Sequence, residues 1–146
     1  MKKVVVANDH GAVELSLKLI EHLKQRGFEV NHLGVSTPES VDYPDMGELG
    51  SKEYLKGGYE FGVLCCGTGI GISIAANKVD GIRCALPQNI FAATMAKEHN
   101  NANMIAFGGR IDYPESPIAM LDAFIDANFE GGRHAKRVDK IMKLEK

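Results

Sequence analysis

The sequence predicts an α/β fold of the Rossmann-like (flavodoxin-like) type, a three-layer sandwich with a five-stranded parallel sheet. Short apolar runs alternate with longer segments whose apolar positions recur every three or four residues, which is typical of strands alternating with helices. Strands joined by crossover helices form a parallel sheet that is covered on both faces. Because 146 residues suit one hydrophobic core and are few for two, we expect residues 1–146 to form a single domain.

The first half of the chain is expected to hold two strands and two helices. "KVVVA" is the first strand, and the helix after it ends at Gly27, a residue that commonly follows a helix. A loop rich in turn formers, "GVSTPESVDYPD", precedes the second helix, which Pro44 opens. The predicted ranges are strand 3–7, helix 13–26, strand 29–33 and helix 44–55.

The second half continues the same alternation and ends in two helices without a strand between them. No internal repeat, low-complexity tract or linker interrupts it. The predicted ranges are strand 61–65, helix 70–78, strand 82–86, helix 89–99, strand 104–107, and helices 117–128 and 133–144.

Composition and charge exclude several classes of function. A net charge of -2 and a sequence pI near 6.2 give no broad attraction for nucleic acid or an anionic membrane. No apolar run is long enough to span a bilayer, and the start "MKKVVVANDHG" reaches acid and glycine too early for a signal peptide. Three cysteines without a C-x-x-C spacing argue against a disulfide framework or a structural zinc site. We expect a cytoplasmic protein with reduced thiols.

Polar and reactive residues gather where the predicted strands end. "NDHG" follows the first strand, "CCGTGIG" contains the end of the third, "GGR" follows the fifth, and "HNNAN" lies at the approach to the fifth. Ligands of open parallel sheets bind beyond the carboxyl ends of the strands, so this is where we expect function. For Asp9 and His10 a turn with a helix N-cap remains an alternative.

The two adjacent cysteines are expected to have different roles. Side chains alternate along a strand, so Cys65 and Cys66 should point to opposite faces of the sheet. Cys65 continues an apolar strand and Cys84 lies within "IRCAL", so both are interpreted as small core residues. Cys66 lies where the strand gives way to a glycine loop and a helix start, a setting that makes a thiolate available near neutral pH.

The "GTGIG" loop has the properties of an anion site. Its glycines let successive backbone N–H groups turn inward, and the following helix start adds partial positive charge. The spacing differs from the dinucleotide fingerprint G-x-G-x-x-G, and no acidic residue closes the next strand, so that interpretation is weak. A simple tight turn is the remaining alternative.

Two further groups carry titratable or basic side chains. His99 ends a predicted helix, where a capping role is the alternative to a functional one, whereas His22 and His32 are expected at the surface. Arg133 and Arg137 are four residues apart, so they share a helical face and would suit a phosphate. A solvated helix end would look the same in sequence.

Taken together, these motifs resemble the ribose-5-phosphate isomerase type B family, which includes allose-6-phosphate and galactose-6-phosphate isomerases. The resemblance covers essentially the whole chain. It rests on "NDHG", "SVDYPD", "CGTGIGISIAANK", "GIR", "HNNAN" and "EGGRHAKRV", in this order. It implies interconversion of an aldose phosphate and a ketose phosphate through an enediolate, with no metal and no organic cofactor.

The resemblance also implies roles for individual residues. Cys66 matches the base that moves a proton between C1 and C2, with Thr68 close by, and His99 matches the acid that opens the furanose ring. It implies a homodimer, either alone or paired into a tetramer, in which the C-terminal arginines come from the partner. The matched substrate contacts are Asp9, His10, Gly67, Gly69, Ile70, Gly71, Asn100, Arg110, Arg133 and Arg137.

Two departures from the family pattern and two rival functions stay open at this stage. "GAVE", containing Val13, stands where members often carry an aromatic residue, and Pro87-Gln88 replaces smaller polar residues, so the sugar pocket is expected to differ. The physiological sugar is ribose 5-phosphate or another of the sugar phosphates, a tetrose phosphate included. The rivals are a phosphometabolite-binding module without catalysis and a metal enzyme using Cys66, His99 and His10.

Overall fold

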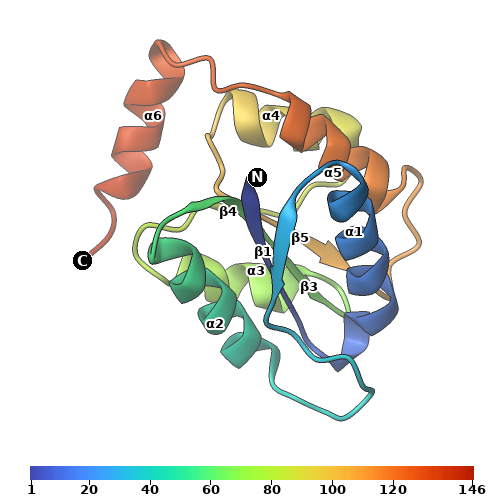
Figure 1. Ribbon diagram of the computed structural model, residues 1–146. Helices are drawn as coiled ribbons and strands as arrows, with labels where there is room; N and C mark the ends of the chain where they lie inside the picture. Colours follow the sequence, from blue (N-terminus) through green and yellow to red (C-terminus); the bar gives the residue numbers. More distant parts are fainter.

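The computed structural model describes residues 1–146 and shows a five-stranded sheet between two layers of helices (Figure 1). All strand pairs are parallel, which confirms the predicted fold class. The strands are β1 (Lys3–Asn8), β2 (Glu29–His32), β3 (Tyr59–Cys66), β4 (Cys84–Ala85) and β5 (Met104–Gly108). The helices are the 3-10 turn η1 (His10–Ala12), α1 (Val13–Gln25), α2 (Tyr43–Leu55), α3 (Ile70–Asn77), α4 (Ile90–Glu98), α5 (Pro117–Asp126) and α6 (Arg133–Met142).

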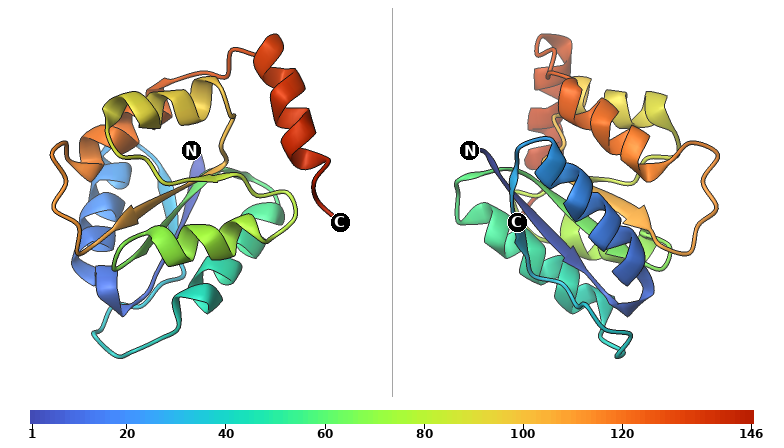
Figure 2. Two further views of the ribbon diagram at one scale, coloured as in Figure 1. Left: turned by 180° about the vertical axis from the view of Figure 1, so that it is seen from behind. Right: turned by 45° about the vertical axis from the view of Figure 1, so that its right-hand side comes forward.

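The order of the strands explains which face each helix covers. The order is β2-β1-β3-β5-β4, so the chain steps in one direction from β2 to β3 and from β3 to β4, and in the other from β1 to β2 and from β4 to β5. Because crossovers between parallel strands are right-handed, opposite steps place their helices on opposite faces. Accordingly, α2 and α3 lie on one face, and α1 and α4 lie on the other together with α5 (Figure 2).

Each face of the sheet has its own apolar core. Cys65 belongs to the core beneath α1, α4 and α5, with Val63 and Phe107. Cys66 belongs to the core beneath α2 and α3, with Leu64 and Met104. The two thiols therefore point to opposite faces, as the alternation of side chains along a strand predicts.

The fourth strand is shorter than expected. Residues 82–86 were predicted as a strand, but only Cys84 and Ala85 pair, opposite Met104 and Ile105. This strand lies at the sheet edge with β5 as its one neighbour. Pro87 offers no N–H for a ladder hydrogen bond, which prevents the strand from continuing.

Helix α6 stands apart from the three layers, at one side of the molecule (Figures 1 and 2). Hydrogen bonds attach the chain to the rest of the protein on both sides of this helix. Before the helix, the N–H of Glu130 donates to the carbonyl of Glu98 at 3.0 Å. After it, the N–H of Gly81 donates to the Glu145 carboxylate at 2.7 Å. Neither α6 nor any other helix is long and apolar enough to cross a membrane.

Candidate active site

Three loops meet at the carboxyl edge of the sheet, beyond β1, β3 and β5. The N–H of Asp9 donates to the carbonyl of Cys65 at 3.1 Å, and the N–H of Gly109 donates to that of Cys66 at 2.8 Å. The N–H of Arg110 donates to the carbonyl of Gly67, also at 2.8 Å. The chain leaves β1 and β3 in opposite directions, which opens a crevice between their ends. The structure thus brings together the three strand-end motifs that the sequence singled out.

Glycine is needed here because the loops touch through their backbones. A Cβ on Gly11 would lie 3.0 Å from the nitrogen of Gly67. A Cβ on Gly109 would lie 2.6 Å from the carbonyl oxygen of Gly11. Any larger residue at either position would push the loops apart, so these glycines set the geometry of the crevice.

Cys66 occupies the centre of this edge. Its side chain is only 4% exposed, and its Sγ accepts a hydrogen bond from the N–H of Gly69 at 3.2 Å. Gly69 has φ of 78° and is the N-cap of α3, so the sulfur lies at the start of a helix. Backbone N–H groups and the partial positive charge at a helix start both stabilise a thiolate.

The other two thiols lie in different surroundings. Complete burial raises the pKa of the Cys65 thiol to about 12, so this group stays protonated at neutral pH. Burial also raises the pKa of the Cys84 thiol. Cys84 was predicted in the core, but it is only partly buried because β4 is an edge strand and the residue borders a cavity.

Asp9 and His10 are both held in place by backbone groups. Asp9 is buried, and its Oδ1 accepts a hydrogen bond from the N–H of Gly11 at 2.8 Å, so it does cap the short turn η1. The Nδ1 of His10 accepts from the N–H of Val41 at 3.1 Å. In the neutral ring the proton is therefore on Nε2, which can donate to a ligand.

The long loop of residues 33–42 folds over this edge, held by residues for which the sequence indicated no role. The buried Asn8 donates through Nδ2 to the carbonyl of Val35 at 2.9 Å, and its Oδ1 lies 2.7 Å from Nε2 of His32. His32 was expected at the surface but is partly buried by this contact. The ring of Tyr43 lies where a Cβ of Gly71 would be. Both Asn8 and Tyr43 belong to quoted motifs, "NDHG" and "SVDYPD", which was the available signal.

The glycine loop also presents polar and apolar groups to solvent. Thr68 is exposed, and its Oγ1 accepts from the N–H of Ile70 at 3.2 Å. Arg110 is exposed too, and its guanidinium lies 3.2 Å from the Cβ position of Gly67. No carboxylate of the chain forms an ion pair with Arg110. This cation is therefore free to bind an anion at the crevice.

His99 and Asn100 lie at the opposite, amino edge of the sheet. In the register between β3 and β5, Gly62 is opposite Met104 and Cys66 is opposite Gly108. The start of β5 is thus four residues away from Cys66 along the strands, about 13 Å. Residues 99 and 100 come before that start, so one chain does not bring His99 to Cys66. The expectation of function at the carboxyl ends of the strands therefore does not hold for the position of "HNNAN", which lies at the amino edge.

At the amino edge His99 contacts His134, which belongs to α6. Its ring stacks on that of His134, with centroids 4.0 Å apart and planes inclined by 10°. Burial and the neighbouring His99 lower the pKa of His134. Arg133 and Arg137 lie exposed along the same helix, which confirms the predicted helical spacing. Neither arginine forms an ion pair within the chain.

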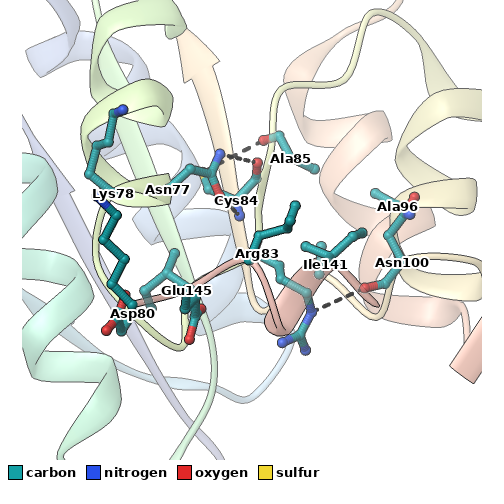
Figure 3. A pocket seen from close by; sticks show the side chains of 14 residues that line it. Asn77, Lys78, Asp80, Arg83, Cys84, Ala85, Ala96, Asn100, Ile141 and Glu145 are labelled. Atoms are coloured by element: carbon teal, nitrogen blue, oxygen red, sulfur yellow. Dashed lines mark hydrogen bonds between the residues drawn. The ribbon is translucent and has the colours of Figure 1, made fainter. Parts of the chain in front are cut away.

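A cavity of about 770 Å³ also lies at the amino edge (Figure 3). It separates the end of α6 from the body of the protein, with Ile141 and Glu145 on one side and Asn77 and Cys84 on the other. Arg83 donates from Nε to the carbonyl of Asn100 at 3.2 Å and so fixes one wall. Cys66 does not line this cavity. The space next to the Cys66 thiol is therefore the open crevice and not this cavity.

Comparisons with known proteins give matches along the whole chain. A sequence model of the ribose/galactose isomerase family matches residues 4–141. Ribose-5-phosphate isomerase B of Escherichia coli is 39% identical over 145 residues, 99% of this chain and 97% of that protein. D-erythrulose-4-phosphate isomerase of Pectobacterium atrosepticum is 37% identical over 142 residues, 97% and 93% of the two chains. The solved structure of Clostridium thermocellum ribose-5-phosphate isomerase B superimposes with a TM-score of 0.93 at 44% identity, over 97% of this chain and 96% of that one.

Proposed function

Because the chain belongs to the ribose/galactose isomerase family, we propose that it interconverts ribose 5-phosphate and ribulose 5-phosphate through an enediolate, with Cys66 as the base. We assign Cys66 as the base because the three thiols of the chain lie in different surroundings. Cys66 alone lies at a strand end, next to a helix start and a backbone donor. Cys65 stays protonated in the core and Cys84 lies at the far edge of the sheet.

The carboxyl edge supplies what proton transfer next to a carbonyl requires. The Cys66 thiolate removes the proton from C2 of the aldose and returns it to C1. The hydroxyl on C2 loses its proton and the former carbonyl oxygen on C1 gains one, so the carbonyl group moves from C1 to C2. Negative charge develops on the carbonyl oxygen as the proton leaves. The backbone N–H groups of the loop 67–71 can donate to that oxygen at a helix start, where an anion is stabilised.

Other residues of this edge are proposed to hold the sugar. Asp9 and His10 stand at the mouth of the crevice, and His10 presents its Nε2 proton. Thr68 and Ile70 line the loop on the solvent side. Arg110 supplies a cation without an internal partner, which suits a phosphate.

The remaining residues are proposed to reach the site from a second copy of the chain. His99, Asn100, Arg133 and Arg137 lie too far from Cys66 to act with it in the same chain. In a homodimer with two-fold symmetry, the amino edge of one copy can face the carboxyl edge of the other, which gives two equal sites. His99 would then open the sugar ring, and the arginines would bind the phosphate.

Exposed apolar side chains support this assembly. Ile70 is 52% exposed and Ile74 is 56% exposed on α3, immediately after the Cys66 loop, and Phe91 is 71% exposed at the start of α4. Leu86, also exposed, touches the Cβ position of Gly69. Such a patch beside a site is typical of a surface that another protein covers. Three free thiols also suit the reducing environment of the cytoplasm.

A tetrose phosphate is the second candidate substrate. The relative named D-erythrulose-4-phosphate isomerase matches this chain about as well as the ribose-5-phosphate isomerases do. Pro87 is buried next to Leu86, and Val13 begins α1 directly behind η1. Both positions depart from the family pattern close to the crevice, so they can alter the length of sugar that fits.

The experiment that tests the function compares turnover of ribose 5-phosphate, allose 6-phosphate and a tetrose phosphate by the purified protein. We expect the highest kcat/KM for ribose 5-phosphate and none above background for Cys66→Ser. A higher value for the tetrose phosphate would replace the proposed substrate and keep the reaction. No turnover of any sugar phosphate, with one of them still bound, would favour the binding module.

A further inference from the structure

We propose that His99, Glu130 and His134 form a binding site for a zinc-type divalent transition metal. One donor atom from each residue, the Nε2 atoms of the histidines and Oε1 of the glutamate, takes part. These atoms all lie within 4.8 Å of one another. Two imidazoles and one carboxylate are a donor set that suits zinc, with a fourth position left for water. The site lies at the amino edge of the sheet, away from Cys66.

The distances are close to those that a bound ion needs. With metal–ligand bonds of about 2.0–2.1 Å and tetrahedral angles, neighbouring ligand atoms are separated by about 3.3 Å. Oε1 of Glu130 lies 3.4 Å from Nε2 of His134 and 3.8 Å from Nε2 of His99. Rotation of the half-buried His99 ring out of its stack on His134 would bring the third donor atom into range, without a change in the fold.

His134 provides an independent reason to expect a ligand. Its ring is 5% exposed, and its Nε2 is buried without a hydrogen-bond partner although it faces Glu130. A buried polar nitrogen without a partner is unfavourable, because it has lost its hydrogen bond to water and gained none in the protein. A metal ion would satisfy this nitrogen.

The backbone holds the three side chains in place. The N–H of His99 donates to the carbonyl of Met95 at the end of α4. The N–H of Glu130 donates to the carbonyl of Glu98, so the carboxylate is fixed directly beside the histidine. The N–H of His134 donates to the carbonyl of Gly131, at the start of α6. The parallel stack of the two rings turns both Nε2 atoms toward one carboxylate oxygen.

Nearby positive charge limits the affinity. Arg133 and Arg137 belong to the same helix as His134 and oppose a second cation, which Glu130 only partly offsets. We therefore expect reversible binding and not a permanently loaded structural site. Occupancy would tie up His99, so zinc should inhibit ring opening. This consequence rests on the proposed role of His99, whereas binding itself does not.

The test is a titration of the purified, metal-free protein with Co²⁺, which absorbs visible light strongly when its coordination is tetrahedral. We expect a band that saturates at one equivalent per chain and is displaced by Zn²⁺. Glu130→Gln keeps the shape of a half-exposed side chain but removes the ligand charge, and should weaken Co²⁺ binding at least tenfold. His22→Gln is the matched control, because His22 pairs with Asp122 elsewhere and should bind Co²⁺ as the parent does.

Three results would overturn the site. They are no visible band at one equivalent, equal Co²⁺ affinity in the Glu130→Gln protein, and a thiolate charge-transfer band that Cys66→Ser removes, which would place the metal on Cys66. If the circular dichroism spectrum of the Glu130→Gln protein is changed, the Co²⁺ affinity of His134→Gln is measured in its place. Saturable Co²⁺ binding without inhibition of turnover by Zn²⁺ would support the site and contradict the proposed role of His99 instead.

Discussion

The two edges of the sheet hold their polar residues in different ways. At the carboxyl edge, backbone hydrogen bonds and glycine contacts lock three loops together around Cys66, which is almost buried. At the amino edge, Arg133 and Arg137 are exposed on a helix that stands apart from the body. The first edge is preorganised for chemistry within one chain, and the second presents its residues outward. This difference is what a site assembled from two copies requires.

The largest expected effect is at the preorganised edge. Cys66→Ser should leave the fold unchanged and lower kcat by about a hundred- to ten-thousandfold at neutral pH, because a serine hydroxyl is a far weaker acid than a thiol and yields almost no base. Steady-state turnover of ribose 5-phosphate measures the loss, and circular dichroism checks the fold.

Cys65→Ala is the control for that change. It removes a buried sulfur from the other core, so it should lower the free energy of unfolding by about 1 kcal/mol and leave kcat nearly unchanged. An inactive Cys65 variant beside a fully active Cys66→Ser protein would reverse the assignment of the two thiols.

At the exposed edge, Arg137→Ala should raise KM about ten- to a hundredfold. A charge-assisted contact to phosphate is worth roughly 1.5 to 3 kcal/mol, and Arg137 has no internal ion pair that would be lost at the same time. Lys140→Ala, on the same helix, is the matched control and should change KM little. Similar KM values for the two variants would show that general charge, and not Arg137, attracts the substrate.

Mixing the two impaired variants, assayed at a substrate concentration far below the raised KM so that each alone is nearly inactive, tests directly whether the edges meet between copies. A heterodimer of Arg137→Ala and Cys66→Ser chains has one site with both changes and one with neither. After subunit exchange at equal amounts, about a quarter of the parent activity should return, since half of the dimers carry one intact site. Exchange confirmed by mass without recovered activity would mean that the arginines act within their own chain or not on phosphate.

His99→Asn should slow the reaction on cyclic sugars at least tenfold, with a smaller effect on a substrate that is already open-chain. The physical reason is that ring opening needs an acid at the ring oxygen, whereas proton transfer by Cys66 does not. The ratio of kcat/KM for the two substrate types is the measurement. An equal loss on both types would assign His99 a structural role, consistent with its stacking on His134.

The last comparison concerns stability and not turnover, at glycines with positive φ at the two edges. Gly69 has φ of 78°, and an added Cβ would lie 2.8 Å from both Leu86 and the backbone of Phe107. Gly131 has φ of 69° with nothing within 4 Å of an added Cβ. Urea unfolding should show a loss of about 3 kcal/mol for Gly69→Ala and about 1 kcal/mol for Gly131→Ala. Equal losses in the free energy of unfolding would mean that the loops at the carboxyl edge accommodate an added Cβ as easily as the segment before α6 does.

The sequence was most informative where a local rule decides the outcome. Alternation along a strand was enough to separate Cys65 from Cys66, and the structure places them in different cores. The position of His99 could also be predicted from the sequence, because a helix that connects two parallel strands must end at their amino edge. The residue type of His99 indicates a functional role, whereas this geometric rule places it away from Cys66 of the same chain. Cys84 packs against the core as predicted but is only partly buried, because β4 is an edge strand and the sequence does not reveal this.

By itself, the sequence determined the kinds of elements, the faces of the sheet and the chemistry of the strand-end loops, since each depends on residues close together in the chain. Only the tertiary structure decided that β5 lies between β3 and β4, that Asn8 ties down the loop of residues 33–42, and that His99 meets Glu130 and His134. These features depend on packing between distant segments, where many pairings satisfy the same local pattern and the total burial of apolar surface selects one.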